Sequence, residues 1–237
     1  MPDVDIIIRT IDERDSAAAV EALARDPDST SAAKAFLDVM TELYWKRKNL
    51  PACIAIGQAG IAFALARAFD ADSSGNKELS YKLRSTAKGL CYNLASFTWD
   101  GWAEPGVAIT PSDLAAGLDA AKANLRLAEE LNRGDLPLSR AHWMLAGHYL
   151  SIADHAKAAS LYRRAAEHAA AAGSRQEELL NQAFASLVAR LIAPDDAHAL
   201  AHMESACNDL REQPDGAGFV RQIETAHQFF AKKLQTR

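Results

Sequence analysis

The histidines His198 and His202 have a spacing that could hold a metal ion. They are four residues apart in a segment that we expect to be helical, and this spacing places both imidazoles on one helix face, an arrangement that suits a transition metal. A third ligand would have to come from Asp195 or Cys207. Neither histidine belongs to an HExxH motif, so we interpret both as surface side chains and predict no metal and no cofactor.

A looser cluster contains His142 and His148, which flank Trp143. These histidines are six residues apart, so a helix would not place them on the same face. Together with Tyr149 they could line a small-molecule cavity. The alternative interpretation is that this helix face belongs to the hydrophobic core.

A loop near residues 98–110 carries two tryptophans and two carboxylates, namely Trp99, Asp100, Trp102 and Glu104. Long loops in compact domains are usually functional or disordered, and two tryptophans argue against disorder. The loop could be a lid whose carboxylates face a ligand. It could equally be a structural plug that covers exposed helix ends.

Several function classes lack support in the sequence. Glycine-rich phosphate loops, nucleophile elbows and paired cysteines do not occur, and the three cysteines lie far apart. The chain has 26 basic and 31 acidic residues, a net charge of −5, which gives no general attraction to nucleic acid or to an anionic membrane. The apolar stretch 50–66 is just short of the ~18 residues of a spanning helix, and we interpret it as buried. The acidic N-terminus has no secretory signal pattern, so we expect a cytoplasmic protein.

Composition and helix signals predict an all-α fold. The chain contains 49 alanines among 237 residues and only 12 glycines and 8 prolines, which favours helices over turn-rich sheets. Start and stop signals divide it into about ten helices. The clearest start is Thr110-Pro111-Ser112-Asp113, and capping-box patterns also occur at Thr10 and at Ser174. No segment shows the alternation typical of a strand.

One expected helical hairpin has small and aromatic residues at regular positions. The pattern consists of Leu145, Ala146 and Tyr149 on a first helix and Ala158, Tyr162 and Ala165 on a second. This spacing resembles a tetratricopeptide repeat, in which small residues mark close helix contacts and aromatic residues fill the gaps between them. Weaker matches occur upstream, at Leu37, Met40 and Tyr44.

The resemblance implies a right-handed superhelix of stacked antiparallel hairpins that forms a single domain over residues 1–237. Residues 1–30 would be an N-terminal capping helix, 31–212 degenerate repeats interrupted by the loop, and 213–237 a C-terminal capping helix. In this family the first helices line a concave groove that binds peptides. The groove positions would be Asp38, Glu42, Trp45, Asn93, Arg140, Trp143, Gly147, Ser151 and Asn181.

We therefore expect a non-catalytic scaffold that binds a protein or peptide segment, apolar or basic in character, with Trp45 and Trp143 as anchors. The main alternative is a small-molecule sensor or an enzyme, with a pocket formed by the tryptophan loop and by His142 and His148. A third hypothesis is self-association as a homodimer, through the segment 50–66 or an end helix.

Overall fold

The computed structural model describes residues 3–235 and confirms the all-α class. Helices make up 82% of the structure, and residues 3–235 contain no strand. The chain forms two compact units, where the sequence suggested one continuous domain. The first unit contains the described residues up to Thr98 together with Gly106–Leu131, and the second contains Trp99–Pro105 together with the described residues from Asn132 onward.

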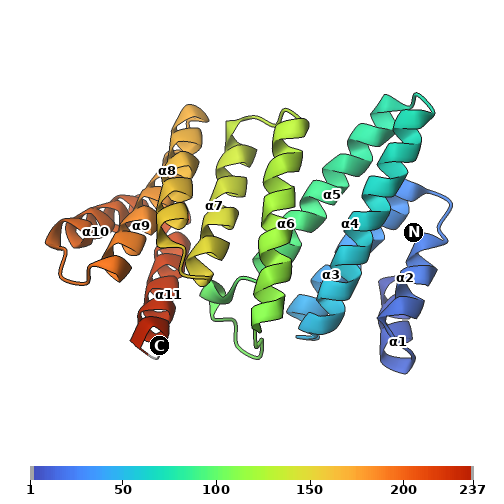
Figure 1. Ribbon diagram of the computed structural model, residues 1–237, viewed down its shortest axis with the longest axis horizontal. Coiled ribbons are helices and arrows are strands. Elements are labelled where there is room, and N and C mark those ends of the chain that lie inside the picture. Colours follow the sequence, from blue (N-terminus) through green and yellow to red (C-terminus); the bar gives the residue numbers. More distant parts are fainter. Residues whose placement is uncertain (1–2, 236–237) are drawn as a thin grey trace. The chain divides into compact units, whose positions relative to one another are not determined.

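The first unit consists of six helices (Figure 1). Their bounds are α1 Val4–Glu13, α2 Ser16–Ala24, α3 Ser29–Trp45, α4 Leu50–Ser73, α5 Lys77–Phe97 and α6 Pro111–Glu130. Consecutive helices from α3 to α6 pack against each other, as expected for stacked hairpins joined by short turns. The single N-terminal capping helix expected from the sequence is therefore two helices, α1 and α2.

Glycine allows α3 and α4 to approach closely. A Cβ atom on Gly60 would lie 2.7 Å from the Cβ of Phe36, and one on Gly57 would lie 2.7 Å from the sulfur of Met40. Real Cβ atoms do not make contacts this short, so larger residues would force the helices apart. Further along the same buried face of α4, Ala64 and Ala68 are 0% exposed in a cluster with Ala33 of α3 and Leu83 of α5.

The second unit contains five α-helices and one turn of 3-10 helix. The 3-10 turn η1 covers Asp100–Trp102, and the helices are α7 Asp135–Ser151, α8 His155–Ala171, α9 Arg175–Ile192, α10 Ala197–Arg211 and α11 Gly216–Gln235. Helices α7 to α10 pack in sequence order, while α11 packs against α9, α10 and η1. Figure 1 shows α7, α8 and α9 as successive neighbours.

The alanines of the hairpin α7–α8 lie where the two helices meet. Ala146, Ala158, Ala165 and the ring of Tyr162 are all 0% exposed. The hydroxyl of Ser139 on α7 donates a hydrogen bond of 2.8 Å to the carbonyl oxygen of Ala165 on α8. Small side chains at these positions let the two helices pack closely.

Of the three helix-start signals in the sequence, the structure confirms one, contradicts one, and shows one without its capping hydrogen bond. The capping box at Thr110 is confirmed, because its hydroxyl accepts from the Asp113 amide while the Asp113 carboxylate accepts from the Thr110 amide. The prediction at Thr10 is wrong: Thr10 lies inside α1, and Asp3 and Asp15 cap α1 and α2. Ser174 precedes α9 but makes no capping hydrogen bond with its side chain.

Candidate functional site

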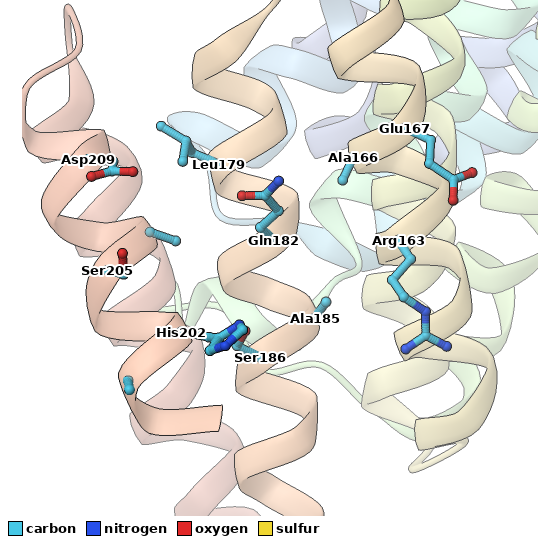
Figure 2. Close-up of a pocket in the computed structure, with 12 residues that line it drawn as sticks. Arg163, Ala166, Glu167, Leu179, Gln182, Ala185, Ser186, His202, Ser205 and Asp209 are labelled. Carbon is cyan, nitrogen blue, oxygen red and sulfur yellow. The ribbon is translucent and has the colours of Figure 1, made fainter. Parts of the chain in front are cut away.

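The second unit carries an open groove formed by α8, α9 and α10. Its volume is about 530 Å³. Helix α9 forms the floor, and α8 and α10 form the two walls (Figure 2). The lining residues are Arg163, Ala166, Glu167, Leu179, Gln182, Ala185, Ser186, Ala201, His202, Ser205, Ala206 and Asp209.

Small residues create the groove, and charged residues give it two different ends. Ala185 and Ser186 lie on the floor beside Leu179 and Gln182, and three of the five residues on the α10 wall are alanine or serine, which leaves space between the walls. Figure 2 shows Glu167 on the α8 wall and Asp209 on the α10 wall toward one end of the groove, and Arg163 and His202 on these walls further toward the other end. The groove therefore has an acidic end and a basic end.

Most of these charged groups are available to a ligand. Asp209 lies 3.5 Å from the guanidinium of Arg175. Arg163, Glu167 and His202 are exposed, and none of them forms an ion pair with another described residue. A bound segment could therefore neutralise Arg163 and Glu167 without first breaking an internal ion pair.

The two histidines that the sequence interpretation placed on the surface are exposed in the structure. His198 and His202 are both exposed on α10, while Cys207, a candidate third ligand, is buried. Within residues 3–235, no three His, Cys, Asp or Glu side chains are arranged to hold a metal ion. His202 instead contributes to the basic end of the groove.

The tryptophan loop is anchored in the core of the second unit. Trp99 is 0% exposed, and its ring lies 4.9 Å from that of Trp102 and 5.5 Å from that of Trp143. A Cβ atom on Gly147 would lie 3.0 Å from the Trp99 indole. The absence of a side chain at Gly147 thus makes room for the buried ring.

A polar network fixes the same loop to two helices. The Ser151 hydroxyl on α7 donates to Asp100 Oδ1 at 2.6 Å. Lys233 Nζ on α11 donates to Asp100 Oδ2 at 2.5 Å and to the Ser151 carbonyl oxygen at 3.1 Å. Because the Asp100 side chain is only 10% exposed, these contacts compensate for the burial of its charge. Of the two interpretations of the loop, this arrangement favours a structural plug.

The groove positions expected on α7 and α9 are mostly covered within the second unit. Trp143 is 6% exposed, and Gly147, Ser151 and Asn181 are also buried. Arg140 is exposed, but its guanidinium makes two hydrogen bonds of 2.8 and 2.6 Å to Glu177 Oε1. The loop and α11 occupy the surface of α7 where a peptide was expected.

The two histidines of the looser cluster are buried as well. His142 is stacked on His168, with 5.3 Å between the ring centroids, and His168 Nδ1 lies 2.9 Å from Asp135 Oδ1. Burial, together with the nearby His168 and Arg164, lowers the pKa of His142 to about 4. His148 is 1% exposed. These imidazoles are parts of the core in this structure, so the pocket suggested for them has no solvent opening at either ring.

The expected groove residues of the first unit remain partly accessible. Glu42 pairs with Lys46 at 2.9 Å, and Asp38 lies 3.8 Å from Lys34. Trp45 is 54% exposed, and its ring lies edge-on to that of Tyr44. Asn93 is half-buried on α5.

Two cysteines of the first unit are unsuited to nucleophilic chemistry. Cys53 and Cys91 are fully buried, and burial raises the pKa of each thiol to about 12. A thiol with such a pKa carries almost no thiolate at neutral pH. Cys207 in the second unit is also buried, and burial raises its pKa too.

Sequence reasoning missed the α8–α10 groove, because its lining is alanine and serine with scattered charges. The only available signal was the outward-facing pair of Arg163 and Glu167, four residues apart on one helix. No model of a known protein family matches the sequence, and no match was found among curated proteins.

Proposed function

We propose that this protein is a non-catalytic helical scaffold that binds a segment of a partner protein in the α8–α10 groove. The groove itself is the observation that carries the proposal, since it is a built, open surface with charges of both signs at its ends. The resemblance of α7–α8 to a tetratricopeptide repeat supports the same function, because repeats of this kind present extended binding surfaces.

The chemistry of the groove defines its partner. A segment with a basic side chain near Glu167 and Asp209 and an acidic side chain near Arg163 and His202 would satisfy both ends. Small or polar side chains between them would fit over Ala185 and Ser186. The partner would therefore be of mixed charge, which differs from the apolar or basic segment expected for a tryptophan-anchored groove.

The open shape favours a protein segment over an enzyme substrate. Catalytic sites usually enclose the reacting groups and exclude water, whereas this groove is open to solvent. Its volume lies within the range of small-molecule sites, so binding of a metabolite is the competing outcome of the experiment below.

A charge-swap variant tests the proposal. Peptides would be selected from a displayed library on the purified chain, and their Kd measured by fluorescence anisotropy. The double variant Arg163→Glu and Glu167→Arg keeps the net charge but reverses the α8 wall, so we expect selected peptides to bind it at least tenfold more weakly. Peptides with reversed charges should recover binding to this variant.

The matched control is Arg221→Glu on the exposed face of α11, which should leave Kd unchanged. Unchanged binding to the double variant would contradict the proposal. So would NMR shifts that map the selected peptides outside α8, α9 and α10. Stabilisation by a metabolite, with no peptide selected, would favour the small-molecule function instead.

A further inference from the structure

A second hollow of the second unit lies between α10 and α11. Its volume is about 390 Å³, within the ~300 to 1,000 Å³ that is typical of small-molecule sites. The α10 residues that line it are Met203, Glu204, Cys207, Asn208 and Arg211, and the α11 residues are Ile223, Glu224 and His227. The periodicity of a helix places these α10 residues opposite the ones that line the α8–α10 groove. This α10–α11 cleft is therefore a separate site.

The fold holds both walls of the α10–α11 cleft in place. Helix α11 begins at Gly216, where a Cβ atom would collide with the Leu210 carbonyl oxygen, so the turn between the helices requires glycine. From there α11 packs on α9 and on η1, and its contact with α10 is the smallest between any two consecutive α-helices of the second unit. The ion pair of Lys233 with Asp100 fixes the other end of α11. The cleft is thus preformed and needs no ligand to open it.

The base of the cleft is apolar and contains a buried thiol. Ile223 is 1% exposed and Cys207 is 7% exposed, and the half-buried Met203 lines the same cleft. Cys207 is a free cysteine, and its thiol makes no hydrogen bond to any residue within 3–235. Because sulfur atoms contact aromatic rings favourably, this base suits an apolar body that contains a ring.

The rim of the cleft carries one carboxylate that is not paired. Arg211 lies 3.4 Å from Glu224 on the opposite wall and donates a hydrogen bond of 2.7 Å to Asn208. Glu204 is exposed and forms no ion pair with a residue of the described chain. Burial, and then the nearby Arg190, lower the pKa of His227, so this imidazole is neutral at pH 7. Two carboxylates against one guanidinium leave the rim with one negative charge.

The unpaired carboxylate lies close to the apolar base. Burial raises the pKa of the Cys207 thiol, and the charges of Glu224 and Glu204 add to the rise, which requires that both carboxylates are near the sulfur. An anionic ligand would meet these carboxylates and a guanidinium that Glu224 and Asn208 already engage. No three metal-ligating side chains within 3–235 are arranged around one point. These contacts therefore favour an organic cation over an anion or a metal ion.

We propose that the α10–α11 cleft binds a small organic ammonium ion. The cation would pair with Glu204, and an apolar body such as an aromatic ring would lie against Met203, Cys207 and Ile223. A charged group at the rim with an apolar base is the usual composition of a small-molecule site. This site goes beyond the scaffold function and does not depend on it.

Titration of the full chain with 2-phenylethylammonium tests the site. Methionines labelled with ¹³C at the methyl group report on it by NMR, because Met203 lines the cleft while Met40 and Met144 are buried in other helices. The variant Met203→Leu assigns the signal. We expect a saturable shift of the Met203 signal alone, with a Kd in the millimolar range or tighter, which is usual for so small a ligand.

The neutral isostere 2-phenylethanol separates charge recognition from apolar burial. It should bind about threefold or more weakly than the ammonium ion, because it lacks the pair with Glu204. Glu204→Gln should weaken the ammonium ion by the same factor and leave the alcohol unchanged. The matched control is Glu212→Gln, which removes an exposed charge just after α10 but outside the cleft and should change neither Kd. Circular dichroism would verify that both variants fold.

Three results would overturn the proposal. They are an unmoved Met203 signal at millimolar probe, equal Kd values for the ammonium ion and the alcohol, and an ammonium Kd that Glu204→Gln does not change. Amide shifts at Ala201 and His202 without a shift of Met203 would place the probe in the α8–α10 groove and would also contradict it. Peptide binding to the groove is measured separately, so either site can fail without the other.

Discussion

Asp100 Oδ2 lies 2.5 Å from Lys233 Nζ, so an ion pair joins a short loop to the last helix across 133 residues of sequence. Ser151 completes the contact by donating its hydroxyl to the same carboxylate. This relationship explains why α11 lies against η1. It also makes the stability of the second unit depend on residues from three separate parts of the chain.

Removing one partner of this pair should destabilise the second unit. Lys233→Met keeps the apolar stem but takes the cation away from the buried Asp100 carboxylate, and we expect a loss of about 2 kcal/mol in the free energy of unfolding. Urea unfolding followed by tryptophan fluorescence measures it, since Trp99, Trp102 and Trp143 all belong to this unit. Lys122→Met, which breaks the exposed pair with Asp119 on α6, should cost at most about 0.5 kcal/mol. Equal losses for both variants would show that the Asp100 pair has no special role.

Two glycines inside helices should respond oppositely to alanine. Gly147→Ala introduces a Cβ atom 3.0 Å from the Trp99 indole and should destabilise the protein by about 1 to 2 kcal/mol through overpacking. Gly89 lies in α5, and a Cβ atom there would have nothing within 4 Å, so Gly89→Ala should stabilise the protein by up to about 1 kcal/mol through helix propensity. Thermal unfolding of both variants provides the comparison. A neutral Gly147→Ala would mean that the loop does not pack as tightly as the structure indicates.

The buried His142 should make stability depend on pH in the acidic range. Its pKa is lowered to about 4 in the folded protein, by burial first and then by His168 and Arg164, whereas the unfolded value is about 6.5. The folded state therefore holds His142 neutral. Its contribution to stability is complete above about pH 6.5 and is lost as the pH falls toward 4, by up to about 3 kcal/mol.

The measurement is urea unfolding at pH 7.5, 6 and 5 for wild type and His142→Leu. The difference between their pH profiles isolates this group from the carboxylates, which titrate in both proteins. His198→Leu, on the exposed face of α10, should have the wild-type profile. If His142→Leu and wild type had the same pH dependence of unfolding, His142 would not be the group that causes the loss of stability at acidic pH.

Much of the helical structure was predictable because its signals are local. The hydroxyl, proline and acidic residue at Thr110, Pro111 and Asp113 satisfy the helix start within four residues of sequence. The same kind of pattern gave a wrong helix start at Thr10. Asp3 caps α1, which begins before Thr10, and Asp15 caps α2, which begins after it. A capping pattern identifies where a helix can start, and competing caps nearby decide where it does start.

The candidate sites were less predictable, because their residues come from separate helices. The periodicity of α7 correctly indicated that Ala146 and Tyr149 belong to a packed hairpin, but not that Trp99 would cover Gly147. The groove of α8, α9 and α10 depends on which faces of three helices remain uncovered after packing. The spacing of residues along the sequence does not show which helix faces remain uncovered.

The sequence by itself determined that this protein is built of helices, where most of them begin, and which alanines lie at their contacts, because hydrogen bonding and periodicity within a helix are local. Only the tertiary structure decided that the 99–105 loop is held in the second unit, that Trp143 is buried while Trp45 is exposed, and that Arg163 and Glu167 border an open groove. The physical reason is that burial depends on contacts between distant segments, such as Asp100 with Lys233, and the free energy of those contacts belongs to the pair and not to either segment.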